Sequence, residues 1–113
     1  MIIFREKRGP TTVLKLQGVV KLGESASQFS EFLEKVLNED DGPVLLDFER
    51  IDTLDSTGLG ELIGYLQRFE ERQRKMAIVK PKDRIVALLR LTRLDTLIRI
   101  FPDEDSALQY LAA

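Results

Sequence analysis

The spacing of apolar and polar residues changes several times along the chain, and each change predicts a new structural element. Residues 2–18 hold two short apolar stretches around the turn-forming sequence RGPT, and polar residues alternate with apolar ones in the second stretch. This pattern is typical of a β-hairpin or of two neighbouring strands. We therefore expect two strands at the amino terminus.

The next segment has the period of a helix. Ser25 and Gln28 have the spacing of a capping box, which predicts a helix start at Ser25. Gly42 and Pro43 predict its end, shortly after Asn38. Between these limits the apolar residues fall on one helical face, at Ala26, Phe29, Phe32, Leu33, Val36 and Leu37.

From residue 44 onward, short apolar runs alternate with amphipathic stretches. The run VLLDF, residues 44–48, is short, apolar and bounded by turn residues, so it predicts a buried central strand. The rest of the pattern predicts, in order, a helix from Leu59 to about 72–75, a strand at 76–80, a helix at 83–94, a strand at 97–101 and a short helix at 103–112, with Asp103 or Asp105 near its start.

Two strands followed by alternating helices and strands define an α/β protein. This order implies a mostly parallel central sheet with right-handed crossovers, about four helices and an antiparallel hairpin at one edge. The length of 113 residues fits a single domain over residues 1–113. Function in such sheets collects at the carboxyl ends of the strands, where we place residues 47–55.

The composition of the chain excludes several classes of functional site. The chain has no cysteine and no histidine, which removes thiolate metal sites, cysteine nucleophiles and the Ser-His-Asp triad. Lys and Arg number 17 against 19 Asp and Glu, so we expect no direct binding to nucleic acid. No apolar run approaches the ~20 residues of a membrane span. The start, MIIFREKRGP, lacks the apolar region of a signal peptide, and we expect a cytoplasmic protein with no membrane insertion.

Ser56 lies between the central strand and the following helix, within the sequence TLDSTGLG. A nucleophilic serine would need an activating base and a G-x-S-x-G turn, neither of which is present, so we expect no catalytic residue and no enzyme. Gly58, Gly60 and Gly64 do not form a P-loop or a G-x-G-x-x-G motif, so we expect no cofactor there. Close packing of these glycines against the sheet is the favoured interpretation, although a helix N-terminus still suits an anion.

Three other roles stay open from the residues alone. Asp55 or Ser56 could cap the helix. Ser56 could instead be a covalent switch, because a phosphate would add about −1.5 to −2 charges, and that charge would repel an acidic or closely fitted partner. Asp47, Asp52 and Asp55 also raise the hypothesis of a Mg²⁺ site, but carboxylates at such places often serve as caps and turns, and we expect no bound metal.

The sequence VLLDFERIDTLDSTGLGELIGYL, residues 44–66, resembles the signature of STAS domains, specifically of bacterial anti-sigma-factor antagonists. In that family an apolar strand ending in Asp leads through a short loop to D-S-x-G-L-G at the start of a helix. The resemblance covers nearly the whole chain, since the acidic final segment DEDSALQYL also resembles the end of the family pattern. It implies a single STAS domain with the STAS fold.

The resemblance also implies a mechanism. The unphosphorylated antagonist binds an anti-sigma factor that is a serine kinase of the histidine-kinase-like ATPase fold, and this frees a sigma factor. The kinase phosphorylates the serine of D-S-x-G, here Ser56, and a PP2C-type phosphatase resets it. Gly58 and Gly60 would let the helix start lie close to the partner. The implied partner-binding residues are Lys21, Asp52, Asp55, Ser56, Thr57, Gly58, Leu59 and Gly60, and we expect a monomer when the protein is free.

Two positions depart from the family pattern. Lys21 stands where the family often has an acidic residue, and Arg93 stands where it often has the glycine of T-G-L.

An alternative role is that of a STAS subunit in a sensory assembly or in a lipid-transport ATPase complex. The apolar residues 85–91 are interpreted as core or as a docking surface, and the charged residues 71–75 as a solvated helix end.

Overall fold

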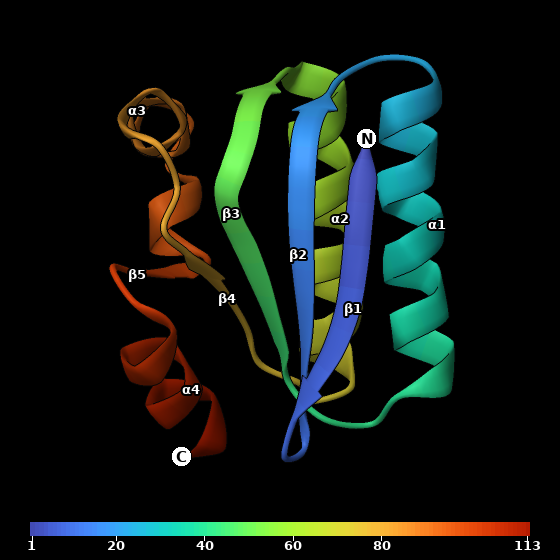
Figure 1. Cartoon of the computed structure of the whole chain (residues 1–113), viewed down its shortest axis with the longest axis vertical. Helices are drawn as coiled ribbons and strands as arrows, with labels where there is room; N and C mark the ends of the chain where they lie inside the picture. The colour runs from blue at the N-terminus through green and yellow to red at the C-terminus, as the bar shows by residue number, and fades with distance from the viewer.

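A five-stranded sheet with helices on both faces forms the structure (Figure 1), a computed structural model that describes all 113 residues. The strands are β1 (Ile2–Arg8), β2 (Thr11–Val20), β3 (Val44–Leu54), β4 (Met76–Val79) and β5 (Arg99–Phe101). The helices are α1 (Glu24–Glu39), α2 (Ser56–Glu71), α3 (Asp83–Leu91) and α4 (Glu104–Ala112), and a short 3-10 turn, η1 (Leu94–Thr96), follows α3.

The strands lie in the sheet in the order in which they occur along the chain. β1 pairs with β2 in antiparallel fashion, and β2, β3, β4 and β5 run parallel to one another. This confirms the predicted α/β class, with a mixed sheet, an antiparallel hairpin at one edge and four helices. Because the three central parallel strands end at the same edge, the loops that follow β2, β3 and β4 lie next to one another.

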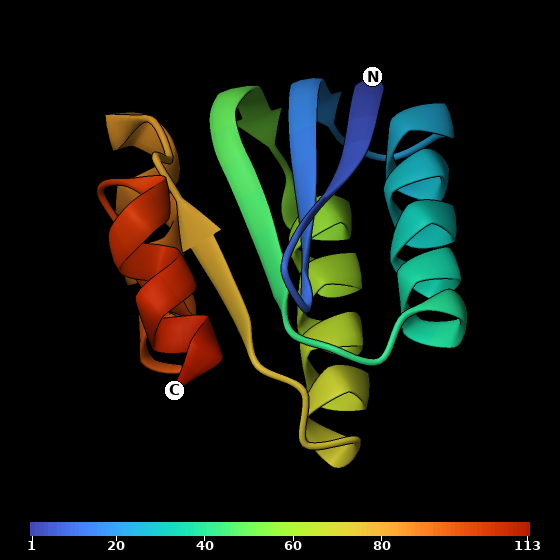
Figure 2. The same ribbon diagram turned by 60° about the horizontal axis from the view of Figure 1, so that its bottom comes forward.

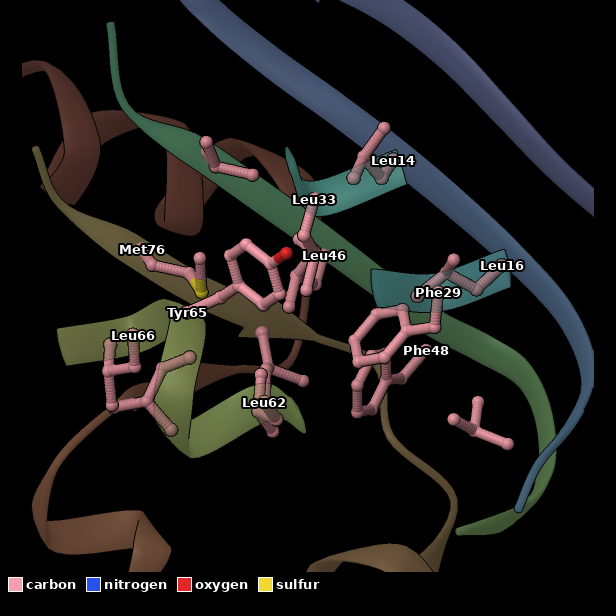
Figure 3. Packing of buried hydrophobic residues seen from close by; sticks show 14 of the residues in the cluster. Leu14, Leu16, Phe29, Leu33, Leu46, Phe48, Leu62, Tyr65, Leu66 and Met76 are labelled. Atoms are coloured by element: carbon pink, nitrogen blue, oxygen red, sulfur yellow. The ribbon is translucent and has the colours of Figure 1, made fainter. Parts of the chain in front are cut away.

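The two faces of the sheet are covered unequally. A core cluster of 23 buried residues joins the sheet to α1, α2 and α3, whereas a cluster of six joins it to α4. Figure 2 shows α1 and α2 on one side of the strands and α4 apart from them. Side chains from β2, β3, α1 and α2 converge in the larger cluster (Figure 3), and each such buried side chain contributes about 1.5–3 kcal/mol.

β3 is longer than the sequence pattern predicted. It continues from the expected residues 44–48 to Leu54, and its pairing with β2 shifts register between Lys15 and Gln17 and again between Gly18 and Val19. These irregularities let Ile51 and Leu54 follow Phe48 into the core at a spacing of three. A spacing of three is not the period of a regular strand. The prediction that the strand ends at residue 48 was therefore wrong, and residues 49–54 belong to β3.

The start of α1 also differs from the prediction. The helix begins at Glu24 after Gly23, whose φ of 109° is in the region that favours glycine, and no side chain caps it. The hydroxyl of Ser25 instead bonds to the backbone of Lys21 as donor and acceptor, at 3.1 Å in each case. The predicted capping box of Ser25 and Gln28 is therefore wrong, since the N-cap is Gly23, two residues before Ser25. The serine instead fixes the loop that precedes the helix.

Arg74 is buried, contrary to the prediction of a solvated segment at 71–75. Its guanidinium donates hydrogen bonds to the carbonyls of Leu37, Val36 and Gly42 at 3.0, 3.2 and 2.8 Å. It also stacks over the ring of Phe69, 4.5 Å from the ring centroid. Burial lowers the pKa of this guanidinium, and the hydrogen bonds compensate for lost solvation by satisfying the carboxyl end of α1.

The departure from the family pattern at Arg93 coincides with an unusual backbone conformation. Arg93 has φ 61° and ψ 19°, in the left-handed region, and it lies between the end of α3 and the start of η1. A side chain in this region costs about 1–2 kcal/mol, and glycine avoids that cost.

Replacement of Arg93 by glycine should therefore stabilise the protein by about 0.5–1 kcal/mol, since the relief of strain exceeds the entropy that glycine loses on folding. Arg93→Ala is the matched control, because alanine removes the charge and keeps the strain. Urea unfolding of the three proteins gives the comparison. Equal stability of the glycine and alanine variants would show that the backbone conformation carries no penalty.

Candidate functional site

Ser56 is the exposed first residue of α2, at the carboxyl edge of the sheet. It directly follows Asp55, which separates the end of β3 from the helix. The first turn of α2 contains no acidic side chain. The N–H groups and the positive end of the helix dipole therefore lie at the Ser56 position, where the carboxylate of the N-cap residue Asp55 takes up the N–H of Gly58.

Asp55 is the N-cap of α2, and its carboxylate joins two separate parts of the chain. One oxygen accepts a hydrogen bond from the N–H of Gly58 at 2.9 Å, and the other accepts one from the N–H of Leu22 at 2.9 Å. The backbone N–H of Asp55 also donates to the carbonyl of Val20 at 3.1 Å. The two side-chain bonds hold the pKa of the Asp55 carboxyl below its usual value, the bond from Gly58 having the larger effect.

Gly58 brings the first turn of α2 against the end of β2. It is buried, and a Cβ at this position would lie 2.8 Å from the carbonyl oxygen of Val20 and 2.7 Å from a methyl group of Leu54. The predicted close packing is thus confirmed for Gly58. It is wrong for Gly60 and Gly64, which are exposed and have no neighbouring atom within 4 Å of an added Cβ.

The remaining sequence-predicted residues divide by exposure. Lys21, Asp52, Ser56 and Gly60 are exposed, Asp55 and Thr57 are half-buried, and Gly58 and Leu59 are buried. The structure thus brings the loop after β2 and the start of α2 together at one surface. Gly58 and Leu59 are buried beneath that surface, and their predicted contact with a partner stays a prediction.

Asp52 connects the site to α3. Its carboxylate forms an ion pair with Lys82, the residue that precedes α3, and this contact lowers the pKa of Asp52. The nearby charge of Arg84 adds a smaller effect in the same direction. The side chains of Lys82 and Asp52 are 38% and 55% exposed, so solvent weakens the attraction. The pair places the start of α3 beside the end of β3.

The structure does not support the Mg²⁺ hypothesis. Asp47 lies inside β3, where it pairs with Lys15 in the ladder, whereas Asp55 follows the end of that strand. The carboxylate of Asp52 forms an ion pair with Lys82, and that of Asp55 accepts hydrogen bonds from backbone N–H groups. No group of three or more acidic side chains in the chain is arranged to hold a metal ion.

Comparison with known proteins identifies the family. The model of the STAS domain family matches residues 3–107, and the chain belongs to this family. A Thermotoga neapolitana protein, named as a homologue of the candidate anti-sigma factor antagonist TM1081, is 30% identical over 81 residues, which are 72% of this chain and 68% of that protein. No helix of the chain has both the length and the apolar character needed to cross a membrane.

Two solved structures share the fold over nearly the whole chain. An anti-sigma factor antagonist from Mycobacterium paratuberculosis has a TM-score of 0.87 and 18% identity, covering 99% of this chain and 94% of its own. SpoIIAA of Bacillus in its unphosphorylated form has a TM-score of 0.81 and 17% identity, covering 98% and 96%. Its phosphorylated form has a TM-score of 0.73 at the same identity, covering 96% and 98%. These likenesses establish the STAS fold.

Sequence reasoning missed two residues at this surface. Leu22 is 78% exposed on the loop that Asp55 holds, and Lys82 pairs with Asp52. Leu22 could have been found from the sequence, since it is a large apolar residue between Lys21 and Gly23 in a turn. Nothing in the sequence indicated Lys82, because its partner lies 30 residues earlier in the chain.

Gly58→Ala should destabilise the protein by about 1–3 kcal/mol, because the backbone oxygen of Val20 cannot easily move away from the added methyl group. The matched control is Gly64→Ala in the same helix, which should stabilise it by about 0.5–1 kcal/mol because alanine favours the helix and meets no atom. Chemical denaturation measures both effects. A Gly58→Ala protein as stable as the wild type would contradict the close approach of α2 to β2.

Asp55→Asn should destabilise the protein at neutral pH. Asparagine has a single acceptor oxygen and cannot serve both Gly58 and Leu22. Because folding lowers the pKa of Asp55, its contribution is present above about pH 3.9 and is lost as pH falls through the folded-state pKa.

The difference in Tm between wild type and Asp55→Asn should therefore shrink as the pH is lowered from 7 to below about 3.9. Thermal unfolding across this range measures it. Asp95→Asn is the control, because Asp95 is exposed and forms no hydrogen bond or ion pair. A gap in Tm between wild type and Asp55→Asn that stays constant across the pH series would refute the role of the charged carboxylate.

Proposed function

We propose that this protein is an anti-sigma-factor antagonist whose binding is switched by phosphorylation of Ser56. The observation that carries the proposal is the position of Ser56, an exposed hydroxyl on a helix start that Asp55 and Gly58 hold rigidly against β2. The names of its relatives, which are anti-sigma factor antagonists, support the same role.

In this function the unphosphorylated protein binds an anti-sigma factor that is also a serine kinase of the histidine-kinase-like ATPase fold, and a sigma factor is released. The kinase then transfers the γ-phosphoryl group of ATP to Ser56. A bond forms between the Ser56 oxygen and the γ-phosphorus, the bond from that phosphorus to the β–γ bridging oxygen breaks, and ADP leaves. A base on the kinase takes the hydroxyl proton, and a PP2C-type phosphatase later hydrolyses the phosphoserine.

The site can accept a phosphate without unfolding. The first turn of α2 presents N–H groups and the positive end of its dipole, and it has no acidic side chain. Asp55 keeps its own carboxylate occupied with two backbone donors. Phosphorylation therefore changes the charge of the surface more than its shape.

The added charge would act against binding. A phosphate brings about −1.5 to −2 charges to a surface that already holds the carboxylates of Asp52 and Asp55. A partner fitted to a neutral hydroxyl would meet repulsion and the cost of desolvating the dianion, which together amount to several kcal/mol. Lys21 is exposed and forms no ion pair, so it would offset a small part of that charge.

Binding of Ser56 variants tests the function. Wild type, Ser56→Ala and Ser56→Asp are immobilised and exposed to the source organism's purified anti-sigma factor kinases, with ADP in place of ATP. We expect wild type and Ser56→Ala to hold a kinase, and Ser56→Asp to weaken that complex by at least about tenfold, since 1.4 kcal/mol of repulsion suffices for that change.

Addition of ATP provides the covalent test. Mass spectrometry should then find one phosphoryl group on wild type and none on Ser56→Ala, and the control Ser106→Ala should be modified like wild type. Equal binding by all three Ser56 proteins, with no modification by ATP, would reject the switch. Binding to transporter or sensory-assembly subunits instead would favour the alternative STAS role.

A further inference from the structure

Part of the sheet is bare on the face opposite α1 and α2. The cluster of six residues under α4 covers only the first part of the strands, where Val13 and Leu45 lie. Figure 1 shows β1, β2 and β3 in front of α2, with α4 beside their lower part and no helix in front of their upper part. The largest hollow of the molecule, about 450 Å³, lies on this bare part, and its volume is typical of small-molecule sites.

The register of the sheet places side chains from three strands in one row along the hollow. Phe4 of β1 pairs with Lys15 of β2, and Lys15 pairs with Asp47 of β3. Because neighbouring strands lie about 4.8 Å apart and paired side chains share a face, this row is roughly 10 Å long. Lys80 lies beyond its end, since it directly follows Val79, the partner of Asp47 on β4.

Phe4 forms the apolar end of the row. Its ring is 56% exposed, and Ile2 on the same side of β1 is 51% exposed. Ile3 lies between them and packs against the core, so Ile2 and Phe4 face the bare side of the sheet. An exposed aromatic ring beside a hollow is suited to stacking with a second planar ring.

Charges of both signs gather at the other end of the row without pairing. Lys80 and Arg50 line the hollow and form no ion pair, and the same is true of Asp47 and Glu49. The one hydrogen bond to the Asp47 carboxylate comes from the backbone N–H of Glu49, at 3.0 Å. The other charged groups of the lining are already paired, Lys15 with Glu6 and Glu104 with Arg8.

The backbone of Lys80 has an unusual conformation. Its φ of 54° lies in the left-handed region, which side chains rarely adopt. The N–H of Lys80 donates to the carbonyl of Phe101 at 3.0 Å, which holds this conformation, and the side chain is half-buried. Residues with such a backbone collect at functional sites. Lys80 is thus a fixed cation at the polar end of the hollow.

We propose that this hollow binds an aromatic amino acid. The ring of the ligand stacks on Phe4, its ammonium pairs with Asp47 and Glu49, and its carboxylate pairs with Lys80 and Arg50. A ligand that carries both charges satisfies both kinds of unpaired group at once, whereas a simple anion or cation leaves one kind unpaired. The row of roughly 10 Å is comparable with the length of tryptophan.

This inference goes beyond the proposed function, because the hollow contains none of the residues assigned to the switch. Calorimetry on the whole chain tests it with four ligands. L-tryptophan has the ring and both charges, tryptamine lacks the carboxylate, indole-3-propionate lacks the ammonium and L-alanine lacks the ring. We expect tryptophan to bind with a Kd of about 1 mM or lower and each of the other three at least about tenfold more weakly.

Variants of the lining locate the site. Phe4→Ala, Asp47→Asn and Lys80→Gly should each weaken tryptophan binding by about tenfold. Asparagine still accepts the hydrogen bond from Glu49, and glycine adopts the backbone conformation of Lys80 without strain, so these variants should melt near the wild-type temperature. The matched control is Leu97→Ala, which truncates a side chain as exposed as Phe4, at 57%, in a different hollow and should leave the Kd unchanged.

Three results would overturn the inference. The first is the absence of saturable tryptophan binding. The second is binding of tryptamine or indole-3-propionate as tight as that of tryptophan, which would exclude a role for one of the two charges. The third is an unchanged Kd in all three lining variants, which would place the ligand elsewhere. Self-association that Phe4→Ala abolishes, without tryptophan binding, would show instead that the bare face joins two copies of the chain.

Discussion

The geometry of the site depends on the carboxylate of Asp55. Its two oxygens accept hydrogen bonds from Leu22 and Gly58, which lie on different elements, so one side chain fixes the loop after β2 relative to the first turn of α2. The contact of Gly58 with Val20 leaves no room for that turn to move closer. Ser56 takes no part in these interactions. Asp55 and Gly58 fix the start of α2, so a group added to the Ser56 hydroxyl would not break their contacts.

A negative charge added at this fixed helix start would act on a partner mainly through its electric field, and only slightly through a change of shape. A helix start that already satisfies its cap and packs tightly has little reason to unfold when an anion arrives, since the dipole favours that anion. In the proposed switch, binding and release differ only by the phosphate on Ser56, and the backbone can keep one conformation in both states.

Regular elements could be predicted from the sequence because each buries one face. The apolar residues of α1 and α2 recur at helical spacing, those of β2 alternate with polar ones, and β4 is a short continuous apolar run. The order of the elements and the sheet type could therefore be predicted. The extension of β3 past Phe48 could not, because register shifts in its pairing with β2 replace the strand period by a spacing of three. The site was located through the D-S-T-G-L-G motif. Its contacts with Leu22 and Lys82 arise from pairs far apart in the chain, and local patterns carry no information about them.

Arg74 has a consequence for the order in which the chain can fold. The last turn of α1 has no basic residue of its own, and the guanidinium groups of Arg72 and Arg74 that donate to the carbonyl of Leu37 come 35 and 37 residues after it. A ribosome therefore completes α1, β3 and α2 before it supplies these two groups. The end of α1 gains its arginine contacts only when the residues just before β4 have been added to the chain.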